Sequence, residues 1–280
     1  MWRSPGLNVS YTSLRESNLR RVREAIRSGG YISHTSGLGK GYLQTNIAIL
    51  PQAFALDFMR YCQRNPKPCP LAGVSDTGNP IMFTLGRDLD IRTDVPAYSV
   101  YRDGVLAETL TDISGLWNED LVAFALGCSF TFEHAVQQAG ISLWHIDHNK
   151  TVPMFRTNID TVPAGPFSGN MVVSMRMVAP DRLDDVIAIS KAFPMAHGAP
   201  IHWGDPHTIG ISDASSPDWG DCVPVAGDQV PVFWACGVTP QVAIQQARPP
   251  LCITHKPGHM LITDIPEDAE VTVMSSWNRT

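Results

Sequence analysis

Charged residues are scarce in this sequence. Asp, Glu, Lys and Arg make up only 17% of its 280 residues, below the quarter or so that is usual in globular proteins. The formal net charge is −6, and no stretch gathers Lys and Arg as a nucleic-acid surface would. The composition therefore argues against a nucleic-acid partner.

Long apolar runs and paired cysteine motifs are also missing. No window approaches the 18 apolar residues of a membrane span, so we expect no contact with a bilayer. The six cysteines show no Cys-x-x-Cys spacing, and a chain of this length does not depend on disulfides. We therefore predict reduced thiols and a cytoplasmic location.

The residues that are abundant describe a globular chain with many fixed turns. Hydrophobic residues make up 44%, enough for a substantial core, and Gly and Pro number 22 each. No internal repeat is visible. Apolar periodicity, caps and turn signals predict two sets of elements. The predicted helices span 13–28, 51–65, 118–126, 129–139, 181–193 and 239–247. The predicted strands span 81–85, 97–101, 105–110, 141–146, 171–178, 231–236 and 251–254.

The last third of the chain suggests how these elements are connected. A buried strand at 231–236, a helix at 239–247 and a second strand at 251–254 form a short crossover, which predicts that the two strands are parallel. We therefore predict an α/β fold whose larger, three-layer α/β domain has a parallel or mixed sheet. This domain is discontinuous, with residues 1–105 and 201–280, and residues 106–200 form a smaller inserted α+β domain.

The segment 127–134, Gly-Cys-Ser-Phe-Thr-Phe-Glu-His, is the richest in chemistry. Gly127 is typical of a stop and Ser129 of a helix cap, which would place Cys128 at a helix start. Free backbone N–H groups at a helix start favour the binding of an anion, or they lower the pKa of the Cys128 thiol. The alternative is one continuous helix with a buried cysteine.

A second group of candidates follows the strand at 231–236. If the sheet is parallel, Gly237 to Thr239 at a helix N-terminus lie beside the segment 255–259, which contains His255 and His259. That arrangement pairs an anion-binding turn with acid and base groups. The alternative is a surface turn at Pro257-Gly258 with solvated side chains.

Other polar segments carry weaker signals. The segments 145–148, 202–207 and 255–259 contain residue types that bind zinc or iron, without a specific spacing, so we predict no metal. Asp205 and His207 flank a tight turn. They are interpreted either as an orienting pair for a catalytic histidine or as a hydrogen bond that stabilises the turn. The glycine-rich segment 37–41 lacks the spacing and the Ser or Thr of a nucleotide-binding loop.

Several blocks, taken together, resemble the D-glutamate cyclase family in order and spacing. They are Gly41–Asn46, Gly127–Glu133, Met154–Ile159, Met171–Arg176, His197–Pro206, Val232–Gln241 and Thr254–Leu261. The resemblance covers about residues 14–270, and it departs at Asp160, where the family has Pro, and at Lys256, where a small residue is commoner. It implies an α/β fold with a second, smaller α+β domain. Bacterial members are described as candidate hydro-lyases, and a mitochondrial relative converts D-glutamate to 5-oxo-D-proline and water.

The chemistry of that reaction suggests roles for the candidates. The α-amine attacks the γ-carboxyl, so a base, a proton donor, a carboxylate clamp and an oxyanion site are required, and no redox cofactor. We expect His255 or His259 as base, Glu133 with a raised pKa as donor and Arg156 as clamp. Cys128 is a pocket wall or a nucleophile that forms a thioester.

The complete set of candidates divides into two groups. The candidate catalytic residues are Glu133, His255, His259, Asp205, His207 and Cys128. The candidate substrate-binding residues are Ser129, Phe130, Thr131, Arg156, Asn158, Gly237, Val238, Thr239, Gln44 and Asn46. The expected partner is a small carboxylate substrate. A dehydratase of another hydroxy acid and a non-catalytic acid-binding protein remain alternatives, and the chain is compatible with a homo-oligomer.

Overall fold

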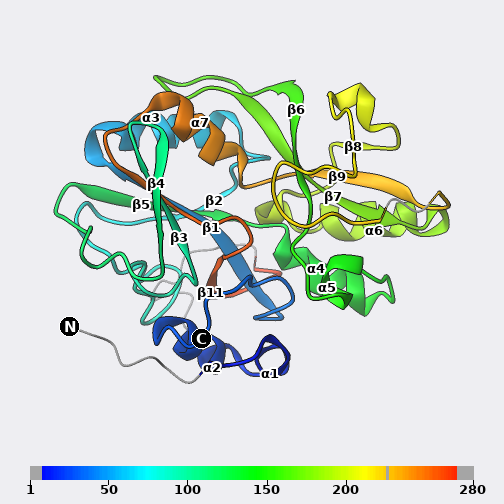
Figure 1. Cartoon of the computed structure of the whole chain (residues 1–280), viewed down its shortest axis with the longest axis horizontal. Helices are drawn as coiled ribbons and strands as arrows, with labels where there is room; N and C mark the ends of the chain where they lie inside the picture. The colour runs from blue at the N-terminus through cyan, green and yellow to red at the C-terminus, as the bar shows by residue number, and fades with distance from the viewer. Residues whose placement is uncertain (1–7, 225–226, 270–280) are drawn as a thin grey trace.

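A computed structural model describes residues 8–224 and 227–269, and within them the strands form two antiparallel sheets (Figure 1). The helices are α1 Tyr11–Arg15, α2 Leu19–Arg27, α3 Gln52–Arg64, α4 Phe130–Gln138, α5 Trp144–Asp147, α6 Leu183–Lys191 and α7 Thr239–Ala247, with short 3₁₀ turns at Pro180–Arg182, Pro194–Ala196 and Pro206–Ile209. The strands are β1 Tyr42–Pro51, β2 Leu71–Val74, β3 Tyr98–Arg102, β4 Val105–Leu110, β5 Leu121–Gly127, β6 Met154–Asp160, β7 Asn170–Val178, β8 His202–Trp203, β9 Val230–Ala235, β10 Cys252–His255 and β11 Leu261–Pro266.

The larger sheet has the order β2-β5-β1-β10-β3-β4, and β11 also pairs with β1. Strand β5 is buried along its whole length, and its alternate side chains enter two different cores. One core contains Ala123 and Ala125, and the other contains Phe124 and Leu126. Burial on both faces explains why this strand is an unbroken apolar run.

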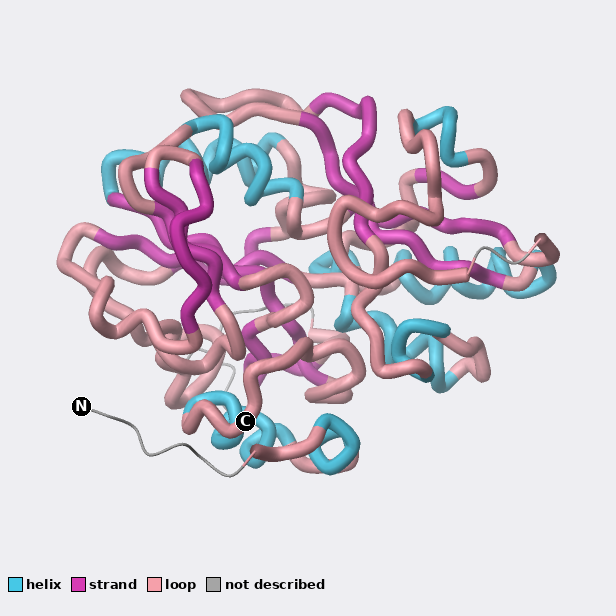
Figure 2. The backbone as a smooth tube through the Cα atoms, viewed as in Figure 1, coloured by secondary structure: helices cyan, strands magenta, loops and turns pink. Residues whose placement is uncertain are grey.

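The smaller sheet has the order β6-β7-β9-β8. In Figures 1 and 2 it lies on the opposite side of the molecule from the β3–β4 hairpin. One of its faces packs on α4 and α6 through Trp234, Phe132 and Val186. The other face is covered by the segment that contains Ile209 and Val223. Each sheet therefore has its own pair of hydrophobic layers.

Two helices connect the sheets, because each follows a strand of one sheet and packs on the other. Helix α4 follows β5 of the larger sheet but packs on the smaller one. Helix α7 follows β9 of the smaller sheet, and its Ala243 and Ile244 pack on the larger one beside α3 (Figure 1). The turns before α4 and α7 therefore lie where the two sheets meet.

Most of the predicted elements are present, and four differ. Residues 118–126 are mostly strand β5 rather than helix, because burial between two cores overrides the helical propensity of Leu and Ala. Residues 141–146 lead into the short helix α5, and 81–85 form a turn with a single bridge at Ile81. The helix predicted at 13–28 is two helices, capped by Ser10 and Asn18.

The parallel sheet predicted from residues 231–254 is not present. Strand β9 pairs with β7 and β8, whereas β10 pairs with β1 and β3 in the other sheet, and every strand pairing within the described residues is antiparallel. The helix between them does not return the chain to its own sheet, so no parallel neighbour results. The α/β class is confirmed only as a mixture of helices and sheets.

The division into two domains remains a prediction, and sheet membership would move its boundaries. Strands β4 and β5 fall within 106–200 but pair in the larger sheet, and β8 and β9 fall within 201–280 but pair in the smaller one. The chain passes between the sheets after Gly127 and after Ala235. All four strands of the smaller sheet lie between these two positions.

Candidate active site

The turn from β5 into α4 is held on strand β1 by two hydrogen bonds. The backbone N–H of Cys128 donates to the carbonyl of Gln44 at 2.9 Å, and the N–H of Gln44 donates to the hydroxyl of Thr131 at 3.0 Å. Ser129 occupies the N-cap position, as predicted, although its side chain makes no capping bond to the helix. Glu133 therefore lies in the first turn of α4, fully enclosed where the two sheets meet.

Glu133 is the centre of a buried ionic cluster. Its Oε1 accepts from Nε and Nη2 of Arg176, at 3.1 and 2.5 Å, and lies 2.8 Å from Nε2 of His145. Burial alone would raise the pKa of Glu133, but the charges and hydrogen bonds of His145 and Arg176 outweigh it, and the pKa is lowered. The raised pKa expected from the sequence is wrong, because the sequence did not reveal this arginine.

Arg176, on β7, ties that cluster to the smaller sheet and to the turn before α4. Its Nη1 donates to Ser174 on the same strand, and its Nη2 also donates to the hydroxyl of Ser129, each at 3.0 Å. The guanidinium lies over the rings of Phe132 and Trp234, at 5.0 and 5.2 Å from their centroids. The arginine is thus fixed by packing as well as by charge, and it holds Glu133 in one orientation.

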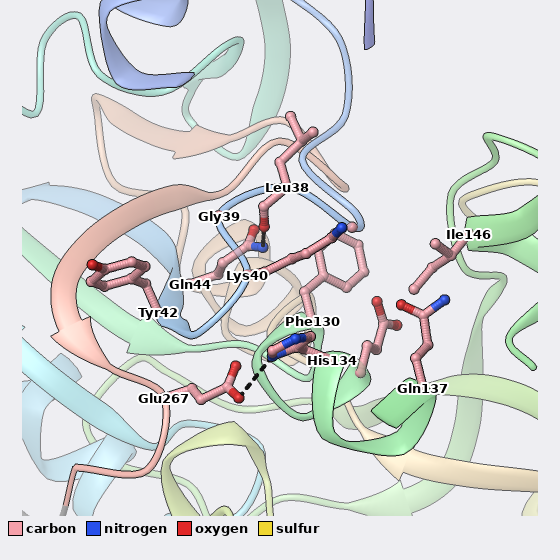
Figure 3. A pocket seen from close by; sticks show the side chains of 12 residues that line it. Leu38, Gly39, Lys40, Tyr42, Gln44, Phe130, His134, Gln137, Ile146 and Glu267 are labelled. Atoms are coloured by element: carbon pink, nitrogen blue, oxygen red, sulfur yellow. Dashed lines mark hydrogen bonds and ion pairs between the residues drawn. The ribbon is translucent and has the colours of Figure 1, made fainter. Parts of the chain in front are cut away.

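A small cavity opens beside Glu133. Figure 3 shows Leu38, Gly39 and Lys40 of the glycine-rich segment on one side and Phe130, His134 and Gln137 of α4 on the other. Gln44 lines the same cavity, and so does Glu133. The volume that the centre of a water molecule can occupy there is about 10 Å³, so the cavity holds about one water.

The turn from β9 into α7 repeats the hydrogen bonds of the first turn. The N–H of Cys236 donates to the carbonyl of Val172 at 2.9 Å, and the N–H of Val172 donates to Thr239 at 3.0 Å. The register agrees, because Thr45 pairs with Gly127 and Val173 pairs with Ala235. The chain therefore contains an internal structural repeat, which the sequence analysis missed because only the pattern Cys-x-x-Thr is shared.

The second turn differs from the first in its polar groups. Gln241 takes the place of Glu133, and its Nε2 lies 3.2 Å from Nε2 of His255. Nδ1 of His255 accepts the N–H of Ile47 at 3.0 Å, and burial lowers the pKa of this histidine to about 4. His255 is therefore a neutral, enclosed side chain. The residue after β9 that contacts His255 is Gln241, in α7, and this contact does not involve the parallel sheet that we predicted.

Two further contacts define this second turn. Asn46 donates to the carbonyl of Gly127 at 2.9 Å, and its amide occupies the space where a Cβ on Gly237 would be. Only glycine fits at Gly237 while Asn46 keeps this position. Val238 and Thr239 are buried beside it. Asn46 therefore links the two turns and is itself enclosed.

The thiols of both turns are buried. Burial raises the pKa of Cys128 well above its usual range, and it raises that of Cys236 to about 11. Neither side chain is in an environment that favours the thiolate. The lowered thiol pKa that we considered for Cys128 is wrong, and its role as a wall of the junction is favoured.

Four of the predicted residues lie away from the junction. Arg156 and Asn158 are exposed on β6, where the Arg156 guanidinium lies 4.7 Å from the Trp219 ring centroid and 3.6 Å from Asp218. Asp205 and His207 are exposed at the 3₁₀ turn after β8, where Asp205 accepts the N–H of His207 at 3.0 Å. Asp205 therefore stabilises a turn.

His259 lies in the loop before β11 rather than in the cavity beside Glu133. Its Nδ1 donates to the carbonyl of Pro257 at 2.9 Å, and burial lowers its pKa to about 4. Nearby, His34 has a lowered pKa, also from burial, and its Nε2 contacts Asn149 at 3.0 Å. These neutral histidines stabilise the loops around the glycine-rich segment.

Sequence reasoning missed Arg176 and His145 as partners of Glu133. Arg176 interrupts the apolar run of β7, Met-Val-Val-Ser-Met-Arg-Met-Val, and a charged residue inside a buried strand is a signal for a buried ion pair. His145 was considered only as a metal ligand on a strand. In the described part of the chain, no group of three or more His, Cys, Asp and Glu residues is arranged to hold a metal ion.

Comparison with known proteins identifies close relatives. The family model described as D-glutamate cyclase matches residues 122–264. A protein of Dinoroseobacter shibae named "Putative hydro-lyase" is 69% identical over 94% of this chain and 88% of its own length. One of Ruegeria pomeroyi with the same kind of name is 69% identical over 96% of this chain and 98% of its own. One of Verminephrobacter eiseniae is 56% identical over 94% and 96%.

A solved structure of a nitrogen repressor-like protein from Methanococcus jannaschii aligns far more weakly. It covers 83% of this chain and 90% of its own, with 11% identity and a TM-score of 0.37. A likeness at that level carries no argument here. In addition, none of the helices in residues 8–224 and 227–269 is long and apolar enough to cross a membrane.

Proposed function

This chain belongs to the D-glutamate cyclase family, and we propose that it is a hydro-lyase that closes D-glutamate to 5-oxo-D-proline with release of water. Relatives that are 69% identical over almost the whole chain bear hydro-lyase names, which supports the reaction class. The proposed substrate follows from the family and from the polar groups around Glu133.

The proton balance of this cyclisation suits one buried carboxylate. The substrate ammonium carries three hydrogens, of which the lactam nitrogen keeps one, and the two others leave with the departing oxygen as water. No electron is exchanged, so the reaction needs no redox cofactor. A single group that takes a proton from nitrogen and passes it to oxygen therefore serves both halves of the reaction.

Glu133 is the group that we propose for this transfer. Its lowered pKa means that it begins as a carboxylate, ready to receive a proton, and not as the proton donor inferred from the sequence. Arg176 and His145 engage Oε1, which leaves Oε2 for the substrate. This division of the two carboxylate oxygens is the observation that carries the proposal.

The substrate carboxylate requires a cation that Arg156 does not supply, because Arg156 is exposed on β6. Lys40 lines the cavity from the glycine-rich segment, and among the described residues its Nζ forms an ion pair with the exposed Glu16, at 3.1 Å. An exposed ion pair of this kind exchanges partners at little cost. We propose that Lys40 binds a carboxylate of the substrate.

The test is a direct assay of water loss. Purified protein is incubated with D-glutamate, L-glutamate and D-2-hydroxyglutarate, and the products are identified by chromatography and mass spectrometry. Formation of 5-oxo-D-proline from D-glutamate alone is the expected result. Dehydration of the hydroxy acid would replace the proposal with another lyase activity, and tight binding without any product would replace it with a binding protein.

A further inference from the structure

Two buried side chains that line the cavity beside α4 each have an oxygen without a hydrogen-bond partner. They are Oε1 of Gln44 and Oε2 of Glu133, and neither finds a partner among the described residues. Both residues are at least 98% buried. A buried acceptor without a donor costs free energy, so two that line one cavity point to a missing group.

The orientation of the Gln44 amide is determined by its neighbours. Its Nε2 donates to the carbonyl oxygens of Leu38, at 2.8 Å, and Thr35, at 3.3 Å (Figure 3). Because a carbonyl oxygen can only accept, the amide nitrogen must face these two groups. Oε1 is therefore the atom that Gln44 leaves for a ligand.

Glu133 leaves the same kind of atom. Its Oε1 is already engaged by Arg176 and His145, and its carboxyl is held as a carboxylate by these two partners. An ionised carboxylate only accepts hydrogen bonds. Gln44 Oε1 and Glu133 Oε2 are thus one neutral and one charged acceptor, and no donor among the described residues, Lys40 of the same cavity included, hydrogen-bonds to either of them.

We propose that Gln44 Oε1 and Glu133 Oε2 together form the binding site for the primary ammonium group of the substrate, with Gln44 as the residue that selects an amino acid over the matching hydroxy or plain carboxylic acid. This assignment rests on the proposed function and extends it to a residue outside the proton transfer. An ammonium group has three N–H donors and a positive charge, so it satisfies both oxygens.

The size of the cavity supports a small donor group. It has space for about one water, and an unsubstituted ammonium is of similar size, whereas an N-methyl group would have to displace part of the cavity wall. The larger remainder of the substrate must lie beyond it, toward Lys40, whose side chain is 37% exposed.

The second turn provides an internal comparison. There Gln241 replaces Glu133, and its side chain is engaged by His255. Val172 replaces Gln44 and offers no side-chain acceptor. Among the described residues of the two copies, the buried side-chain oxygens without a hydrogen-bond partner belong to Gln44 and Glu133, in the α4 copy. The free oxygens are therefore not a consequence of the turn geometry itself.

The experiment combines a protein change with a ligand change. Gln44→Met removes the acceptor at nearly constant volume, and glutarate is D-glutamate without its amine. We expect the variant to raise the KM for D-glutamate about tenfold or more, with a smaller change in kcat. The inhibition constant of glutarate should stay within about threefold of the wild-type value. N-methyl-D-glutamate should inhibit the wild type at least about tenfold more weakly than D-glutamate binds.

Comparing both ligands in both proteins separates the loss of a direct contact from a loss of structure, because a distorted cavity would weaken the binding of D-glutamate and glutarate equally. Gln246→Met, the same replacement on the exposed side of α7, should leave both constants unchanged. Equal losses for D-glutamate and glutarate in Gln44→Met, with cyclisation intact, would overturn the ammonium site and leave the function standing. The opposite outcome is also distinguishable. If calorimetry shows that Gln44→Met loses D-glutamate binding selectively while the wild type cyclises nothing, the ammonium site stands and the proposed function is overturned.

Discussion

Glu133 and Gln241 occupy the same position in two copies of one strand-turn-helix unit, and only Glu133 is ionised. Each lies two residues after a threonine whose hydroxyl accepts a backbone N–H at 3.0 Å. Arg176 and His145 surround Glu133, whereas Gln241 contacts His255. The two units thus share a backbone and differ in chemistry, which makes the α4 turn the one to test.

Glu133→Gln should lower kcat by about two orders of magnitude or more, because the amide cannot accept the proton from the substrate nitrogen. The measurement is the steady-state rate of 5-oxo-D-proline formation, with circular dichroism to confirm folding. Glu108→Gln makes the same change on the exposed strand β4 and should retain the wild-type rate. Near-normal turnover in Glu133→Gln would remove this residue from the mechanism.

Arg176→Met should destabilise the protein by about 3–5 kcal/mol, since it leaves the Glu133 carboxylate buried without its main cation. The matched control is Arg156→Met, which should cost less than about 1 kcal/mol because that ion pair is half exposed. Urea unfolding followed by tryptophan fluorescence gives both values. Similar losses for the two variants would mean that the Glu133–Arg176 pair does not stabilise the junction.

Alkylation of the native protein should label Cys222 and leave the buried thiols unmodified. Cys222 is exposed, and the other cysteines, at 62, 69, 128, 236 and 252, are buried. Iodoacetamide treatment followed by peptide mass spectrometry reports each site before and after unfolding in urea. Fast labelling of native Cys128 would contradict its raised pKa and restore the thioester alternative.

A separate kinetic test addresses the same cysteine. If Cys128 is a wall of the junction, Cys128→Ala should retain kcat within about tenfold, because no covalent bond to sulfur is formed. A thioester mechanism instead predicts a loss of several orders of magnitude. Rapid-quench mass spectrometry of the wild type, which should show no acyl-enzyme, provides the independent check.

Gly127→Ala should be strongly destabilising, because its Cβ would overlap the backbone carbonyl of Met195, which cannot rotate away. Gly237→Ala should also destabilise, by displacing Asn46. Gly115→Ala serves as the control, since nothing lies within 4 Å of its added Cβ and it is exposed. Thermal melts of the three variants should place Gly115→Ala near the wild type and the other two well below it.

Stability should fall as the pH is lowered from about 6.5 to 4. Burial lowers the pKa of His197, His255 and His259 to about 4, below the ordinary value of about 6.5 in the unfolded chain. The unfolded state therefore binds more protons in this window. Each histidine contributes stability that is complete above pH 6.5 and that falls by up to about 1.4 kcal/mol per pH unit below it.

Urea unfolding at pH 7.5, 6 and 5 measures this dependence. His255→Gln keeps an acceptor for the N–H of Ile47 and removes one titrating group, so its stability should depend less steeply on pH than that of the wild type. His207→Gln, at an exposed turn, should show the wild-type slope. An equally steep dependence in His255→Gln would show that this histidine does not titrate as described.

Local structure could be predicted wherever the signal was contained in neighbouring residues. Asp103-Gly104 specified the β3–β4 hairpin, and the periodicity and proline positions specified α3, α6 and α7. The pattern at 118–126 was misinterpreted because alternate side chains of its apolar run are buried in two different cores. Only the sheet shows that both faces of this strand are covered.

The sequence by itself determined the family and most of the elements, because caps, turns and motif spacing are local properties, and it singled out residues 127–134 as the segment to test. Only the tertiary structure decided that α4 and α7 cross between two antiparallel sheets. That crossing brings Arg176 and His145 onto Glu133 from distant parts of the chain, and their charges reverse the direction of its pKa shift. Long-range electrostatics of this kind depends on distances that no sequence spacing contains.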